Sequence, residues 1–167
     1  MGLISAGARR LIETRMFALF RHSDSLELIR SRLAPPLPDL PSIELVADRF
    51  TLAKRRWRGA AADGREFGFD LERPLRHNDI FFQTETHSYV IVQAPEAVLR
   101  IAFTDPAQAA RAAWQVGNMH FAVAVREDCL FVEDDPILRQ LLEREGIVFT
   151  AARAIFQPLG GAAGHRH

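Results

Sequence analysis

Histidines at the end of this 167-residue chain could bind a metal ion. His165 and His167 are separated by one arginine and follow the small-residue run 160–164. Imidazole nitrogens bind nickel, copper and zinc, so this pair could close on an ion that other groups also hold. Alone, the pair would bind an ion weakly. A mobile, solvated chain end without a role is the alternative interpretation.

A third candidate ligand, His120, lies where a predicted helix gives way to a predicted strand. Gly117 and Asn118 both tolerate the left-handed backbone that ends many helices, so we predict that the helix ends at Gly117. His120 would then project from a sharp, exposed corner. A lone histidine at such a corner is usually structural or solvated. Two-fold symmetry in a dimer could nevertheless bring two of these imidazoles to one ion.

The elements that position His120 follow from patterns in the second part of the chain. Asp105-Pro106 and Asp135-Pro136 each combine a capping side chain with proline in the first turn, which predicts two helices. Gly117 and Gly146 predict their ends. Apolar or alternating runs predict strands at 98–103, 121–125 and 130–132, and one or two strands over 147–156. The order β-α-β-β-α-β is the ferredoxin-like arrangement.

Short strands also fill the preceding part of the chain. Residues 42–103 contain apolar and aromatic runs, including Phe50-Thr51-Leu52, separated by turn signals such as Asp63-Gly64. This spacing predicts a small all-β barrel or sandwich. Prolines at 35, 36, 38 and 41 predict an extended connector before it. The spacing of apolar residues in 1–22 predicts a helix or a loose extension, to which we assign no role.

Composition bounds the class of protein. The 21 basic residues balance the 21 acidic ones, and 48% of residues are hydrophobic, as in a soluble globular protein that is not a dedicated nucleic-acid binder. No apolar run approaches the ~18 residues that cross a bilayer, and we find no secretory signal. The single cysteine, Cys129, cannot form an internal disulfide, fits a cytoplasmic setting and should be a small buried hydrophobe.

Two other classes of function compete with metal binding. No nucleophile motif, phosphate loop or His-Glu-x-x-His signature occurs, and Asp135 is better explained as a cap, so we expect no enzyme. The alternative is an RNA- or protein-binding module with a ferredoxin-like sheet and no metal role, suggested by the basic run 54–58. Strand 121–125 has one aromatic residue, fewer than RNA-binding sheets use. His22, His77 and His87 are expected to be solvated.

Several of these motifs together resemble the UreE family, the urease accessory nickel metallochaperones. They are the corner Gly117-Asn118-Met119-His120, the helix start Asp134–Leu138, and the segment 156–161 followed by the terminal histidines. In the earlier part, 55–58, 63–68 and 78–80 resemble the N-terminal β domain of the family. The resemblance covers roughly residues 25–167.

The resemblance implies an α+β fold in several parts. These are an extension (1–22), a small all-β N-terminal domain (23–97), a ferredoxin-like metal-binding domain (98–157) and a flexible tail (158–167). It also implies a homodimer that holds Ni(II) at its interface through His120, with His165 and His167 as further ligands. Zn(II) or Cu(II) can substitute, because both accept imidazole.

The implied role is delivery of nickel in the cytoplasm. The implied partners are the urease apoprotein and the other accessory proteins, including the GTPase, with no nucleic acid and no membrane. Binding should weaken below about pH 6.5, because imidazole must be neutral to bind metal. Met119 stands where the family usually has a basic residue, and the tail has only two histidines, which argues against high-capacity storage.

Overall fold

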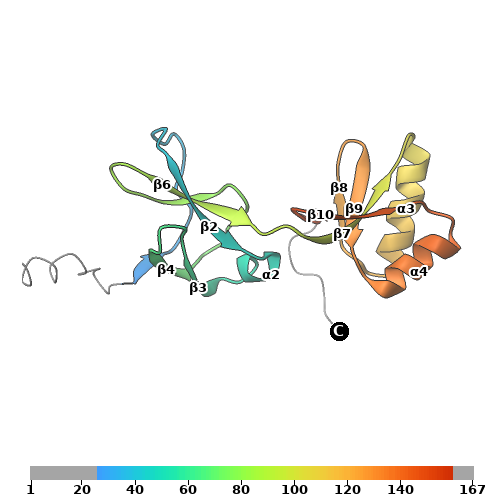
Figure 1. The fold of residues 1–167 in the computed structure, drawn as a ribbon, viewed down its shortest axis with the longest axis horizontal. Helices are drawn as coiled ribbons and strands as arrows, with labels where there is room; N and C mark the ends of the chain where they lie inside the picture. The colour runs from blue at the N-terminus through green and yellow to red at the C-terminus, as the bar shows by residue number, and fades with distance from the viewer. Residues whose placement is uncertain (1–25, 160–167) are drawn as a thin grey trace, which may run out of the picture.

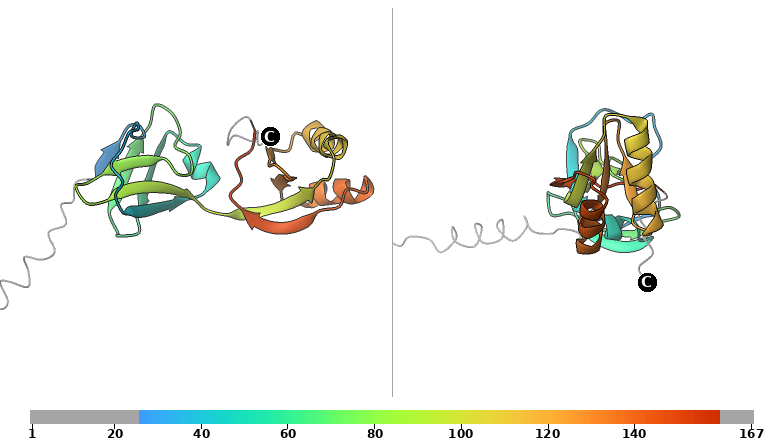
Figure 2. Two further views of the ribbon diagram at one scale, coloured as in Figure 1. Left: turned by 90° about the horizontal axis from the view of Figure 1, so that it is seen from above. Right: turned by 90° about the vertical axis from the view of Figure 1, so that its right-hand side faces the viewer.

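The computed structural model describes residues 26–159, which form a mixed α+β structure dominated by strands (Figure 1). The α+β class predicted from the sequence is therefore confirmed. We call residues 26–95 the first half and residues 96–159 the second half. The two halves are joined by the short segment between β6 and β7, as Figure 2 shows.

The first half contains two three-stranded sheets, ordered β1-β4-β3 and β2-β6-β5. Its elements are β1 (Glu27–Ile29), β2 (Ser42–Ala47), α2 (Arg49–Leu52), β3 (Arg56–Ala60), β4 (Glu66–Asp70), β5 (Ile80–Gln83) and β6 (Ser88–Gln93). Aromatic rings fill the core between the sheets: Phe67 lies 5.0 Å from Phe81 and 5.2 Å from Tyr89 between ring centroids. The proline-rich connector between β1 and β2 contains no helix or strand, as predicted.

One predicted strand in the first half is wrong. Residues Phe50 to Leu52 belong to the single helical turn α2. The carboxylate of Asp48 accepts hydrogen bonds from the backbone N–H of Thr51 (2.9 Å) and from its hydroxyl (2.7 Å). This cap satisfies a backbone group that a helix start otherwise leaves unpaired, so the segment curls instead of extending.

The second half has the element order β-α-β-β-α-β that the sequence predicts. Its elements are β7 (Glu96–Ala102), α3 (Pro106–Asn118), β8 (Val123–Val125), β9 (Cys129–Glu133), α4 (Pro136–Arg144) and β10 (Thr150–Ala154). The strands form one sheet in the order β10-β7-β9-β8, and all neighbours are antiparallel. The apolar run after α4 gives one strand, shorter than the range predicted for it.

Both helices of the second half cover the same face of this sheet. Leu99 and Ile101 of β7 and Leu130 and Val132 of β9 pack in one core with apolar residues of α3 and α4. The opposite face carries a smaller core, centred on Val98, Ala124 and Phe156. Alternation along a strand sends successive side chains to opposite faces, which explains why Val98 and Leu99 lie in different cores.

The two helix starts of the second half are as predicted. The carboxylate of Asp105 accepts hydrogen bonds from the N–H groups of Ala107 (2.8 Å) and Gln108 (3.0 Å), and Asp135 caps α4 in the same way. A proline follows each cap in the first turn. Over residues 26–159, no helix is long and apolar enough to span a bilayer.

Candidate functional site

The corner that carries His120 is a hydrogen-bonded helix ending. His120 has a positive φ of 61°, its N–H donates to Gly117 O (2.9 Å), and the N–H of Phe121 donates to Val116 O (3.3 Å). These two bonds define the Schellman motif, with His120 at the left-handed position that glycine usually occupies. An L-residue there costs about 1–2 kcal/mol, although histidine occurs there more often than most residue types.

The predicted helix end at Gly117 is wrong. Helix α3 continues to Asn118, and the left-handed residue is His120 itself. The reason lies in packing beyond the corner: Val116 is fully buried, and Phe121 packs against the same core. An apolar contact between the residues that flank a Schellman turn commonly accompanies it, and here it fixes the turn at His120.

Helix α4 ends with the same motif but with the expected residue. Gly146 has φ of 66°, its N–H donates to Glu143 O (3.1 Å), and Ile147 N–H donates to Leu142 O (2.8 Å). The predicted end of α4 is confirmed. Two helices of one sheet layer therefore end alike, one on glycine and one on histidine. His120 keeps an exposed side chain at a position where glycine would be less strained.

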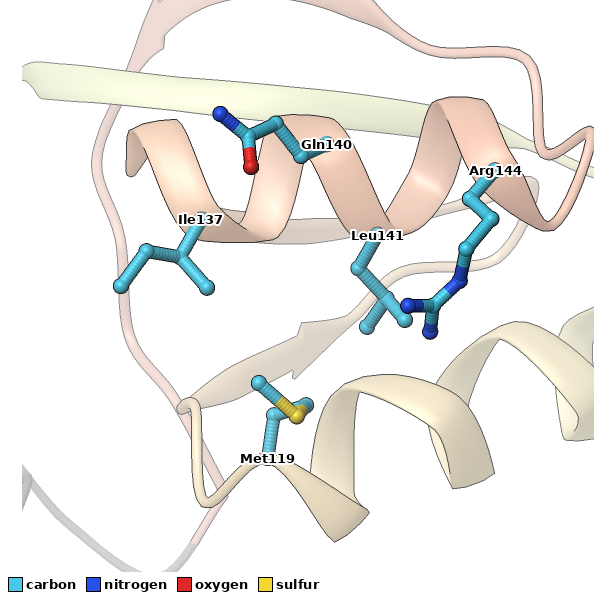
Figure 3. Close-up of a pocket in the computed structure, with 5 residues that line it drawn as sticks. All are labelled: Met119, Ile137, Gln140, Leu141 and Arg144. Carbon is cyan, nitrogen blue, oxygen red and sulfur yellow. The ribbon is translucent and has the colours of Figure 1, made fainter.

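An apolar surface lies next to His120. Met119 and Ile137 are 43% and 59% exposed, and together with Gln140, Leu141 and Arg144 they line a groove of about 280 Å³ between the end of α3 and one face of α4 (Figure 3). We call this surface the α3–α4 groove. Trp114 on α3 is also exposed, so it is not a core residue. The groove thus combines exposed apolar side chains, Met119 and Ile137, with polar ones, Gln140 and Arg144.

The described part of one chain does not complete a metal site. Within residues 26–159, no three side chains among the histidines, cysteines, aspartates and glutamates lie close enough together to hold one ion. Cys129 is buried as predicted, and burial raises the pKa of its thiol, which disfavours the thiolate that metals bind. Further ligands for an ion at His120 must come from a second copy or from outside residues 26–159.

His165 and His167 lie outside the described residues, so chain length bounds where they can reach. The N–H of Leu159, the last described residue, donates to Val123 O (2.8 Å). Val123 follows His120 by three residues, which span at most about 11 Å. The six residues from 160 to 165 span up to about 20 Å. The chain is therefore long enough to bring His165 to His120.

Of the remaining histidines, His22 lies outside the described residues, and His77 and His87 each have a local hydrogen-bond partner. His77 is not simply solvated as predicted, because it is partly buried and its Nδ1 accepts a hydrogen bond from the N–H of Gln93 (3.2 Å). His87 is also partly buried and has Nδ1 2.9 Å from the hydroxyl of Thr86. Each side chain has a local structural partner.

Sequence reasoning missed a charged cluster where the two halves meet. Arg49 is 3% exposed, yet its Nε donates to Glu96 (3.0 Å) and its Nη2 donates to Glu133 (2.7 Å). Burial disfavours the charged guanidinium, but the hydrogen bonds that it donates to the Glu96 and Glu133 carboxylates outweigh burial and raise the pKa of Arg49. The partners lie 47 and 84 residues away, so no local pattern could have indicated the cluster.

Comparison with known proteins agrees with the resemblance. Residues 96–167 match the family described as UreE urease accessory protein, C-terminal domain. A urease accessory protein UreE of Pseudomonas fluorescens is 36% identical over 145 residues, covering 84% of this chain and 86% of the relative. The same-named protein of Ralstonia nicotianae is 35% identical over 128 residues, covering 74% of this chain and 61% of the relative. That of Burkholderia thailandensis is 34% identical over 151 residues, with 85% and 71% covered.

These matches place the chain among the urease accessory proteins, which are not themselves enzymes, as the absence of catalytic motifs predicts. Within that class, the chain belongs to the UreE family. The family recognised from the sequence is thus confirmed, together with a urease accessory role. The alignment spans about three fifths of the Ralstonia nicotianae relative and most of the Pseudomonas fluorescens one.

Proposed function

We propose that this chain is a nickel chaperone, which holds Ni(II) between two copies of itself and hands it over for assembly of the urease active site. One His120 from each copy provides the first ligands, and His165 and His167 of the tail provide further ones. The observation that carries this proposal is the exposed imidazole at a left-handed helix end, next to the exposed apolar groove. The family membership supports the link to urease.

The α3–α4 groove supports the dimer. A two-fold axis that passes near the groove would bury Met119 and Ile137 of both copies and bring the neighbouring imidazoles together. Met119 would then act by packing, because its thioether is a soft, weak donor for nickel. The dimer supplies what one described chain lacks, a second imidazole for the same ion.

Few fixed ligands suit a protein that must release its cargo. With one His120 imidazole from each copy and the two tail histidines, water can fill the remaining positions of an octahedral or square nickel complex. An acceptor protein can displace that water without unfolding the site. Zn(II) and Cu(II) also accept imidazole, so both should compete with nickel at this corner.

The domain assignment and partners are part of the proposal. The order of strands and the placement of both helices on one face support a ferredoxin-like metal-binding domain over 98–157. A β-rich domain (23–97) precedes it, the extension (1–22) comes first, and the tail (158–167) follows. The partners implied by the family resemblance are the urease apoprotein and its other accessory proteins, including the GTPase, in the cytoplasm.

Nickel titration by calorimetry tests the proposal. The intact protein, His120→Ala, a form truncated after Gly164, and the control His87→Ala are compared. We expect His120→Ala to remove most of the binding, truncation to lower affinity or stoichiometry, and His87→Ala to bind like the intact protein. Binding by His120→Ala that equals that of the intact protein would overturn the proposed site.

A further inference from the structure

Two side chains of the first half hold one residue at the base of the C-terminal tail. The side chain of Gln93, which is almost fully buried, donates from Nε2 to Phe156 O (2.7 Å). The guanidinium of Arg49 lies 5.0 Å from the centroid of the Phe156 ring, within the range of a cation–π contact. Phe156 itself is fully buried. The first half therefore contacts both the backbone and the ring of Phe156, and we call these contacts of Gln93 and Arg49 the grip.

Arg49 is held firmly enough to act as part of such a grip. Its guanidinium bonds to Glu96 at the start of β7 and to Glu133 at the end of β9, and it lies 4.4 Å from the Phe50 ring. The two strands are antiparallel, with Val98 opposite Glu133, so these two carboxylates meet at the same end of the sheet. A planar guanidinium can bond to both at once, which a lysine ammonium does less well.

The chain beyond Phe156 is directed toward the His120 corner. Strand β10 is at one edge of the sheet and β8 is at the other. Between them, Phe156 packs on the face opposite the helices, and Arg126 Nη2 donates to Ile155 O (3.3 Å). The N–H of Leu159 then donates to Val123 O at the start of β8. The tail thus starts beside the strand that directly follows the His120 corner.

We propose that Arg49 and Gln93 are positioning residues that lock Phe156 and thereby fix residues 157–159, the root of the tail, beside β8. This inference rests on the proposed function only in that the tail carries His165 and His167. It gives the first half a part in the proposed metal binding, because residues 157–159, from which the tail with His165 and His167 continues, are positioned by it. The grip also fixes the orientation of the two halves, since its contacts cross their junction.

Amide hydrogen exchange measured by NMR tests the grip without using nickel. The N–H of Leu159 reports directly, because its only protection in the described structure is the bond to Val123 O. In Arg49→Met and Gln93→Met, we expect exchange at Leu159 to accelerate at least tenfold. Amides of α4 should be unaffected, which shows that the sheet and its helices stay folded. Arg49→Lys should give an intermediate acceleration, because lysine keeps the positive charge but lacks the planar guanidinium that bonds to both carboxylates.

Arg56→Met is the matched control. Arg56 pairs with Asp70 (2.8 Å) on the exposed surface of the first half, so this ion pair does not cross to the second half. Its removal should leave Leu159 exchange unchanged. If Arg49→Met fails to fold, Gln93→Met carries the test, because it removes one hydrogen bond with little change in shape. Unchanged Leu159 exchange in folded Gln93→Met and Arg49→Met would overturn the inference.

Nickel titration of the same variants connects the grip to ligand positioning. We expect the affinity of Arg49→Met and Gln93→Met to fall to that of the form truncated after Gly164, and no further, since His120 is untouched. If neither His120→Ala nor truncation after Gly164 lowers the nickel affinity, the proposed function is refuted. The exchange result at Leu159 does not depend on that outcome. Faster exchange with undiminished nickel affinity would refute the link between the grip and the tail ligands.

Discussion

Replacing His120 by glycine should separate stability from nickel binding. The left-handed backbone of an L-residue costs about 1–2 kcal/mol, which glycine avoids. Against this, glycine adds about 0.4–1 kcal/mol of conformational freedom to the unfolded chain. The balance predicts that His120→Gly changes the free energy of unfolding by about 0 to +1.6 kcal/mol. The variant that lacks the His120 imidazole should therefore be as stable as the intact protein or more stable.

Thermal unfolding of the metal-free protein measures this balance. For a chain of this length, each kcal/mol shifts Tm by about 2–4 °C, so we expect a rise of up to about 6 °C. The same preparation should lose most nickel binding in a titration. His120→Asn is the first control, because asparagine tolerates the left-handed backbone but lacks an imidazole. It should retain stability and lose nickel. Gly146→Ala tests the equivalent position of α4 and should destabilise by about 1 kcal/mol.

Two results would refute the reasoning at different points. If His120→Gly is destabilised by more than about 1 kcal/mol, the imidazole stabilises the folded corner through contacts. Backbone strain would then not be the main effect of His120 on stability. Nickel binding that survives in both His120→Gly and His120→Asn would mean that the side chain is no ligand. The stability result and the binding result are independent, so each failure identifies the step that is wrong.

Three further predictions concern two neighbouring residues of α4, the carboxylate of Asp48 and the pH dependence of nickel affinity. Leu138→Ala should destabilise by about 2–5 kcal/mol, because the side chain is fully buried, whereas exposed Ile137→Ala should barely change the unfolding of the metal-free protein and should weaken self-association measured by light scattering. Bonds from the hydroxyl and N–H of Thr51 lower the pKa of Asp48, so its contribution to stability is present above about pH 3.9 and is lost as the pH falls through the lower folded value. Urea unfolding of Asp48→Asn should therefore depend less on pH below about 4 than that of the intact protein. Nickel affinity of the intact protein should fall between pH 7 and pH 5.5, and an unchanged affinity would exclude imidazole ligands.

Local chemistry explains which parts of the fold the sequence could predict. Asp105 and Asp135 cap the helices because a carboxylate two or three residues before free N–H groups satisfies them, whatever surrounds the helix. Gly146 ends α4 because it alone in that segment adopts the left-handed backbone without strain. In each case the deciding atoms lie within a few residues of one another, so a single sequence contains the information.

The predictions that failed concern positions where the sequence allows several local conformations and where contacts with residues distant in the chain select one. At the end of α3, Gly117, Asn118 and His120 could each take the left-handed position, and the burial of Val116 with Phe121 selects His120. That selection depends on the sheet and on α4, which complete the core around both residues. A left-handed turn at Gly117 would also have placed His120 differently relative to Met119 and the α3–α4 groove.

The Arg49 cluster shows the limit most clearly. The Glu96 and Glu133 carboxylates meet only because β7 and β9 are antiparallel in one particular register. Arg49 belongs to the helical turn α2, in which residues 50–52 were predicted as strand. The family match begins at residue 96 and so divides the cluster, with Glu96 and Glu133 on one side and Arg49 and Gln93 on the other. A second half without the first would keep Glu96, Glu133 and Phe156 but lose the Arg49 and Gln93 side chains that contact them. The junction is therefore part of the second half's own architecture, and the first half cannot be treated as a separate attachment.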